Sequence, residues 1–172
     1  EDGSRFLLMN IMGGGWGGRP AGDGESASMS ICQGDVRNAP VEVQEMNYPV
    51  VITCHRLRTD SGGSGEYAGG LGVEIRYRCL QDTAVNVNFD RTVDAPWGLH
   101  GGLPGAVNEA VIYRIDGSEE RVLKQTNIQL IAGDEVSFFT GGGGGYGDPK
   151  KIAEQIKNSP SEDNTINIKL LE

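Results

Sequence analysis

Three glycine clusters constrain the fold of this chain more than any other feature of its sequence. They lie at residues 13–18, 60–72 and 141–147, and each contains or adjoins an aromatic residue. Glycine permits positive φ angles and close approach of backbones. The clusters therefore predict either tight corners covered by aromatic rings or a bare backbone surface that fits a substrate or partner closely. The 27 glycines do not repeat every third residue and only 7 prolines accompany them, which excludes collagen.

Short runs rich in β-branched and aromatic residues separate the clusters and predict β strands. Several runs alternate apolar and polar residues, so one face of each strand is expected to be buried. The predicted strands are 6–12, 42–48, 50–57, 72–80, 84–90, 109–115, 127–130 and 136–140. We expect a single, mainly β domain over residues 1–172, a sandwich or distorted barrel of about eight to nine antiparallel strands.

One short helix is predicted near the C-terminus, over residues 149–157. Asp148 can cap its start, Pro149 suits the first helical position, and an apolar stripe follows at Ile152, Ala153 and Ile156. A final strand is predicted at residues 165–171, where apolar and polar residues alternate again.

Charge and cysteine content narrow the classes of function. With 24 acidic and 15 basic residues, the net charge of −9 opposes binding to nucleic acid or to an anionic membrane. Apolar runs are far shorter than the roughly 20 residues that cross a bilayer. Three cysteines without a C-x-x-C pair favour neither a disulfide framework nor a zinc site. We expect a cytoplasmic protein that binds no metal through this chain.

No complete catalytic centre is visible in the sequence, and the catalytic residues stay unknown. Asp90 and Arg91 end a predicted strand and are expected to brace the next loop as an ion pair. His100 lies in a glycine-bounded loop, which gives it a better chance of contacting a ligand than His55 has. The candidate substrate or interface residues are Gly14, Trp16, Arg19, Asp90, Arg91, His100, Gly144 and Tyr146.

The third cluster permits two interpretations. Gly142-x-Gly144-x-x-Gly147 matches the dinucleotide-binding fingerprint, although it would belong to the only βαβ unit of the chain. The cluster also leads into the predicted helix, so its backbone N–H groups are expected to face an anion such as a carboxylate or phosphorylated intermediate. The alternative is a helix-entry turn covered by Tyr146.

Six motifs in order resemble the C-terminal part of the hydantoinase B/oxoprolinase family. They are GGGWGGRP at 13–20, RNAPVEVQE at 37–45 with Tyr48 and Pro49, DSGGSG at 60–65 with GGLG at 69–72, Asp90 with Arg91, PWGL at 96–99 with Gly101 and Gly102, and GGGGYGDP at 142–149.

This resemblance implies a β-rich subunit or segment of an ATP-dependent amidohydrolase that opens cyclic amides, or of a related ketone carboxylase. It implies two partners, a hydantoinase A-like subunit that binds ATP and the remainder of a hydantoinase B-like subunit. No cofactor is expected in this chain, whereas ATP and Mg are expected in partner chains, with a transition metal as an open alternative. The chain is thus expected to be a small subunit or a fragment that is inactive alone. A non-catalytic, glycine-rich β-sandwich binding module is the alternative.

Overall fold

Alternating apolar and polar residues place most of this chain in β strands. The computed structural model describes residues 6–30, 33 and 36–151. In this part, seven strands form two antiparallel sheets, accompanied by one short helix. The elements are α1 (Val41–Asn47), β1 (Val50–Leu57), β2 (Val73–Cys79), β3 (Thr83–Asn88), β4 (Glu109–Tyr113), β5 (Glu119–Val122), β6 (Lys124–Leu130) and β7 (Glu135–Phe139).

The two sheets share one hydrophobic core. The larger sheet has the strand order β1-β2-β7-β4-β5, and the smaller sheet pairs β3 with β6. On β2, Ile75 and Tyr77 are buried on the face that packs with Ile112 of β4 and with Val87 and Leu130 of the smaller sheet. The mainly β fold with two packed sheets is confirmed, and the described strands do not close into a barrel.

Ion pairs cover the opposite face of the larger sheet. Three glutamates lie beneath five arginines, and each glutamate contacts two of them. The contacts join Glu74 with Arg56 and Arg76, Glu135 with Arg76 and Arg78, and Glu109 with Arg58 and Arg121. The side chain of Glu74 is only 5% exposed. The hydrophobic core of the sheets therefore lies on one side of the larger sheet only.

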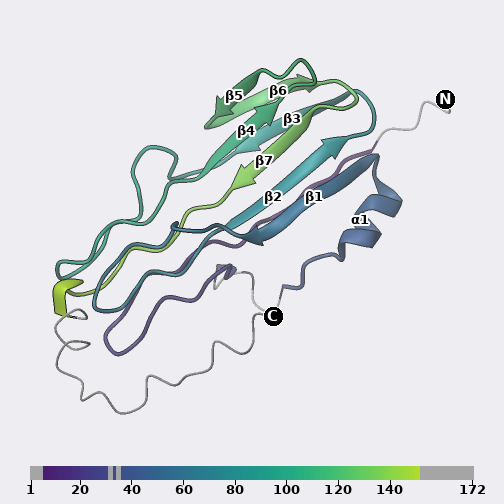
Figure 1. Cartoon of the computed structure of the whole chain (residues 1–172). Helices are drawn as coiled ribbons and strands as arrows, with labels where there is room; N and C mark the ends of the chain where they lie inside the picture. Colours follow the sequence, from purple (N-terminus) through teal and green to yellow (C-terminus); the bar gives the residue numbers. More distant parts are fainter. Residues whose placement is uncertain (1–5, 31–32, 34–35, 152–172) are drawn as a thin grey trace, which may run out of the picture.

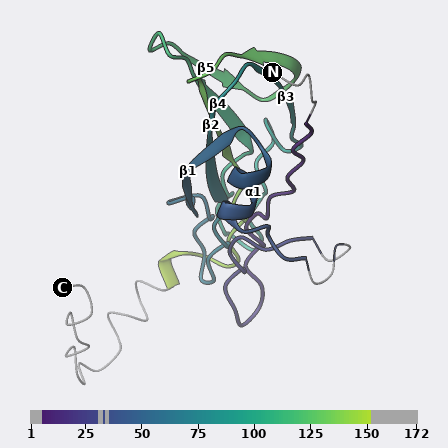
Figure 2. The ribbon, with the colours of Figure 1, turned by 90° about the vertical axis from the view of Figure 1, so that its right-hand side faces the viewer.

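Residues 42–47 belong to helix α1, and the prediction of a strand over 42–48 is wrong. Pro40 precedes the helix, and the N–H of Tyr48 closes it by donating to the carbonyl of Gln44. Glutamate, glutamine and methionine, which fill much of the segment, are strong helix formers. The helix lies against β1, as Figure 2 shows, and Glu45 accepts a hydrogen bond from the N–H of Ile52 (2.8 Å).

The segment 6–12 does not pair as the predicted strand. It runs beside the core, where Leu8 and Met12 pack against buried residues, and the amide of Asn10 donates to Tyr77 Oη (2.7 Å). A strand needs a hydrogen-bonded neighbour. No described segment provides one for these residues.

The start of the C-terminal helix agrees with its prediction. The N–H of Lys150 donates to Asp148 Oδ1 (2.9 Å), and residues 150–151 are helical. The remainder of the predicted helix and the strand predicted at 165–171 lie outside the described residues. Among the residues that the structure describes, no helix combines the length and the apolar character that a membrane span requires.

Candidate functional site

Glycine-rich segments run side by side at the end of the molecule opposite the sheets (Figure 1). We call residues 13–18, 61–72, 97–105 and 141–147 the glycine bundle. Segment 141–147 lies at its centre, because it bonds to all the others. Gly143 N–H donates to Gly70 O (2.9 Å), Gly145 N–H donates to Leu103 O (2.9 Å), and Gly144 O accepts from the N–H of Gly18 (2.8 Å).

The central segment winds with a period of three residues. A Cβ added to Gly142 or Gly145 would lie 1.9 Å from Ser61 O or 2.2 Å from Ser64 O, so both residues face the same neighbouring segment. Gly143 and Gly144, between them, face different neighbours. Three residues per turn is the period of the polyproline II helix. Because neighbours surround the central segment, none of these four positions has room for a side chain.

Segments 13–18 and 141–147 are therefore extended and closely packed, and the prediction of tight corners is wrong for them. Cluster 60–72 does turn, because the N–H of Gly69 donates to the carbonyl of Gly63 (2.8 Å). Within 141–147 only Gly147 has a positive φ (+77°), so close approach explains the other glycines. The sequence does carry a sign of this packing. Glycines whose added Cβ would overlap a neighbouring backbone occur in pairs spaced three residues apart. The pairs are Gly15 and Gly18, Gly69 and Gly72, Gly102 and Gly105, and Gly142 and Gly145.

Two predicted functions of segment 141–147 are not supported by this arrangement. The N–H groups of Gly143, Gly145 and Tyr146 donate to backbone carbonyls of the bundle. Gly144 is buried, and an added Cβ would lie 1.9 Å from Trp97 O. An anion or a nucleotide phosphate would have to displace these contacts. In the described structure these three N–H groups are therefore already engaged and not available to an anion or a nucleotide.

Gly14 and Trp16 belong to an outer segment of the bundle. Gly14 exchanges two backbone hydrogen bonds with Ser28, of 3.0 and 2.8 Å. Trp16 donates its N–H to Glu25 O and accepts a hydrogen bond from Gly70 N–H, while its indole remains partly exposed. Both residues thus hold the bundle together through their backbones.

Two tyrosines and a histidine gather where the bundle ends. The ring centroid of Tyr146 lies 4.9 Å from that of His100 and 6.5 Å from that of Tyr67. His100 and Gly101 form a tight turn, with φ of +51° and +97°, which Gly102 N–H closes on Leu99 O (3.0 Å). We call Tyr67, His100 and Tyr146 the aromatic tip.

Charged side chains flank the aromatic tip. Lys151 Nζ lies 3.3 Å from Glu66 Oε2. Gly18 packs against the backbone of Tyr67 and Tyr146, and Arg19 follows it in the chain. The guanidinium of Arg19 donates a hydrogen bond to Asp23 O (3.0 Å). Because His100 and Arg19 are exposed, the tip can offer hydrogen bonds and ring contacts to a partner or a small polar molecule.

Asp90 and Arg91 lie apart from the tip and do not brace the loop as an ion pair. Asp90 lies 3.5 Å from Lys124, whereas Arg91 stacks over the ring of Trp97 at 4.7 Å. Asn108 fixes this loop instead. Its side chain donates to Asp90 O (2.6 Å) and accepts from the N–H of Gly141 (2.6 Å), and its backbone N–H donates to Arg91 O (3.0 Å). Asn108 and Tyr67 are not among the predicted site residues.

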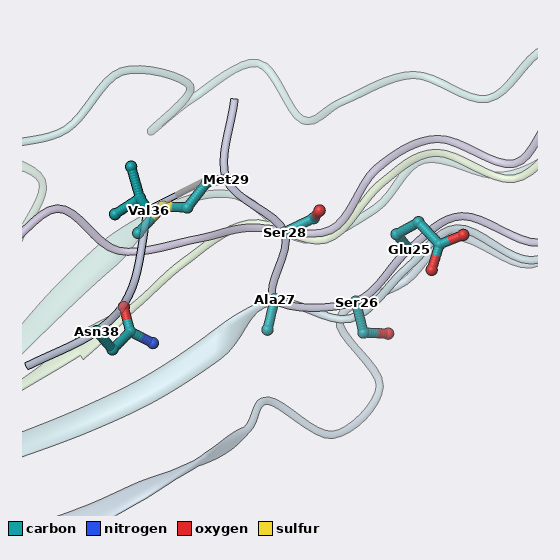
Figure 3. Close-up of a pocket in the computed structure, with 7 residues that line it drawn as sticks. All are labelled: Glu25, Ser26, Ala27, Ser28, Met29, Val36 and Asn38. Carbon is teal, nitrogen blue, oxygen red and sulfur yellow. The ribbon is translucent and has the colours of Figure 1, made fainter. Parts of the chain in front are cut away.

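The surface hollows offer no further catalytic arrangement. One of about 350 Å³ has Met29 and Val36 at one end and Glu25 at the other (Figure 3). Ser26, which also lines it, already accepts a hydrogen bond from Leu71 N–H. A second, of about 310 Å³, lies over residues 90–94.

The groups whose pKa is shifted lie on β1 and β2 or in the turns that follow β4 and β6. Burial, and secondarily Asp134, raises the pKa of Cys79 to about 11. In the described ranges, no three His, Cys, Asp or Glu residues are grouped so that they could hold a metal ion. The described residues thus form a backbone scaffold with an aromatic tip.

The sequence profile of the family described as hydantoinase B/oxoprolinase matches residues 1–149, which include the whole glycine bundle. Caprolactamase subunit beta of Pseudomonas jessenii is 32% identical over 150 residues, covering 84% of this chain and 26% of the relative. 5-oxoprolinase 1 of Arabidopsis thaliana is 32% identical over 146 residues, covering 83% of this chain and 11% of that protein.

Solved structures share the fold. The crystal structure of ATP-dependent caprolactamase from Pseudomonas jessenii has a TM-score of 0.67 and 27% identity, covering 86% of this chain and 27% of that chain. Nucleotide-free acetone carboxylase has a TM-score of 0.65 at 21% identity, covering 79% of this chain and 23% of that chain. This chain spans about a quarter of the length of either structure.

Proposed function

Because this chain belongs to the hydantoinase B/oxoprolinase family, we propose that it is the glycine-rich β segment of an enzyme complex that hydrolyses cyclic amides using ATP. The observation that carries this proposal is the family match across the whole glycine bundle. The two relatives at 32% identity bear the names of enzymes for caprolactam and 5-oxoproline, both of which are cyclic amides. A cyclic amide is therefore the substrate class that we propose.

The role of this chain in the complex is to hold the aromatic tip in a fixed position. The bundle fixes the aromatic tip through backbone contacts that leave little freedom of movement. A rigid support suits a site whose other residues come from another part of the protein, because catalytic geometry tolerates only small displacements. We infer that the tip faces the substrate site or the adjoining subunit, and that this chain does not hydrolyse the substrate alone.

We further propose that ATP and Mg bind to a hydantoinase A-like partner. The glycine fingerprint of this chain does not suit ATP, because Gly142, Gly144 and Gly147 are buried and the N–H of Gly147 donates to the carbonyl of Leu99 (2.9 Å). The remainder of a hydantoinase B-like protein is the second proposed partner. The match to this chain covers 26% of caprolactamase subunit beta, which leaves most of such a protein to contribute other residues. We propose the cytoplasm as the site of action, where ATP is available and the thiols of Cys54 and Cys79 stay free.

Ketone carboxylation is the second candidate reaction, and the fold of acetone carboxylase favours it. The complex reconstituted with a hydantoinase A-like subunit and the remainder of a B-like subunit separates the two. We expect ATP-dependent opening of 5-oxoproline, hydantoin or caprolactam and no carboxylation of acetone with bicarbonate. Omission of this chain is the control and should abolish turnover. Binding of a cyclic amide to this chain alone would instead indicate a binding module.

The aromatic tip has its own test in the same complex. We expect His100→Asn to retain the turn, because asparagine tolerates a positive φ, while it removes the imidazole. If the tip borders the substrate, kcat/KM falls by about tenfold or more at an unchanged melting temperature. Unchanged turnover would assign His100 a structural role.

A further inference from the structure

The segment 6–12 exposes apolar side chains that its own chain does not cover. Leu7 and Met9 are each 80% exposed, and Ile11 is 52% exposed. Between them, Leu8 packs against the core and Asn10 bonds to Tyr77, so side chains alternate in and out as in a β strand. The segment therefore has one apolar face on the core and a second apolar face in solvent.

The backbone of this segment is equally unpartnered. Within the described chain, no backbone hydrogen bond connects residues 6–12 with another segment. Main-chain N–H and C=O groups are almost always paired once they are buried. Strands that are apolar on both faces are typical of sheets covered on both sides. The segment thus has the properties of an internal strand without its neighbouring strand.

Helix α1 extends the same apolar region. The ring of Phe6 lies 6.2 Å from that of Tyr48, which follows α1, and Tyr77 Oη bridges Asn10 and Gln44 of α1. On this helix Met46 is 85% exposed and Val43 is also exposed. Residues 6–12 carry no charged side chain, although the whole chain has a net charge of −9. The partner that fits here is apolar.

We propose that residues 6–12 pair as a β strand with the remainder of a hydantoinase B-like protein, which covers Leu7, Met9 and Ile11. This inference rests on the proposed function. The occupant follows from length, because about three quarters of caprolactamase subunit beta lies outside the region that this chain matches. A protein part of that size must contact this chain somewhere. Segment 6–12 offers it both an unpaired strand edge and an exposed apolar face.

The test uses the tagged chain expressed in its own cells and isolated with the polypeptides bound to it. We expect mass analysis to identify a hydantoinase B-like polypeptide. We expect the amides of residues 6–12 to exchange at least 100-fold more slowly in that complex than in the separated chain. The variant Met9→Lys should weaken association with that polypeptide at least tenfold. Because Met9 is exposed, the melting temperature of the separated chain should stay unchanged.

The matched control is Ile115→Lys, an equivalent change at an exposed apolar residue beyond β4, and it should leave association intact. Copurification with rapid exchange at 6–12, or with full association of Met9→Lys, overturns this inference and leaves the proposed function standing. Absence of any hydantoinase B-like polypeptide overturns both. Protection of the segment in a homodimer of this chain overturns the proposed occupant in favour of a second copy.

Discussion

At the scale of single residues, Gly144 allows a direct test of the bundle. A Cβ at this position would overlap Trp97 O, and both atoms belong to backbones that neighbouring hydrogen bonds hold in place. We expect Gly144→Ala to lower the free energy of unfolding by about 2 kcal/mol or more. The measurement is urea denaturation of the purified chain.

Gly17 provides the matched control in the same bundle. Its added Cβ would lie 3.6 Å from Gly144 O, an ordinary contact, and its φ is not positive. Gly17→Ala should therefore change stability by less than about 0.5 kcal/mol. Equal effects of the two substitutions would refute close packing as the reason for the glycines.

Asp134 makes the stability of the folded chain depend on pH in the acidic range. Burial by itself raises its pKa, but hydrogen bonds from the N–H groups of Ile115 and Ile131 and from Arg114 outweigh it, and the net pKa is lowered. A lowered pKa in the folded state gives stability that is complete above about pH 4 and is lost as the pH falls through the folded value. We expect Asp134→Asn to cost about 2 kcal/mol at pH 7. The difference from wild type should shrink below about pH 4 in denaturation series.

Cys79 should resist alkylation in the folded chain. It is buried, and with a pKa of about 11 almost none of it is thiolate at pH 8. Cys54 is only partly buried. In a Cys32→Ser background we expect iodoacetamide to label Cys54 alone in the native chain and both thiols after denaturation. Fast native labelling of Cys79, read by mass spectrometry, would contradict its placement in the core.

The sequence predicts part of the aromatic tip and of the neighbouring loop contacts, and the remainder escapes prediction for a physical reason. His100 and Tyr146 were predicted because glycines flank them, and they do meet at one end of the bundle. Tyr67 and Asn108 were missed because their roles depend on contacts with segments far along the chain. Asp90 and Arg91 were paired because they are adjacent, yet their side chains contact Lys124 and Trp97. Adjacency in sequence does not determine side-chain partners.

At the scale of elements, α1 protects the edge of the larger sheet. Glu45 accepts the N–H of Ile52 on β1, an outer strand of that sheet. We expect Glu45→Ala to accelerate amide exchange at Ile52 and to lower stability by about 0.5–1.5 kcal/mol. Glu42→Ala, on the same helix, is the control and should not alter exchange at Ile52. If both variants behave alike, the helix covers the edge without this hydrogen bond.

The elements that the sequence predicts correctly are those with a clear alternation of apolar and polar residues or many β-branched residues. Residues 50–57 and 73–79 alternate clearly or are rich in β-branched residues, and they form β1 and β2. Strand β5 was missed because its four residues are mostly charged and exposed. The segment 42–48 was misassigned because seven residues contain too few turns to display a helical period. Segment 6–12 has a strand pattern, but pairing depends on a neighbour that lies outside the pattern itself.

At the scale of the whole molecule, the two ends should differ in thermodynamic character. The sheets bury apolar side chains, whereas the glycine bundle buries mainly backbone. The urea m-value follows the total surface exposed on unfolding. The heat-capacity change rises with apolar exposure and falls with polar exposure. We expect the ratio of heat-capacity change to m-value to be about a fifth below that of ordinary globular domains. Calorimetry combined with urea titration measures it, and an ordinary ratio would contradict a backbone-filled bundle.

The position of segment 141–147 at the centre of the bundle also has a consequence for synthesis on the ribosome. The outer segments, from residue 13 onward, emerge first, and each lacks its hydrogen bonds to the central segment until the central glycines have left the exit tunnel. Contacts this distant in sequence form slowly, since a long loop must close before any of them is made. Strand β7 lies between β2 and β4 in the larger sheet and immediately precedes these glycines in sequence. We therefore expect the β1–β2 and β4–β5 pairs to form first, and the larger sheet and the bundle to be completed together once residues 135–147 have emerged.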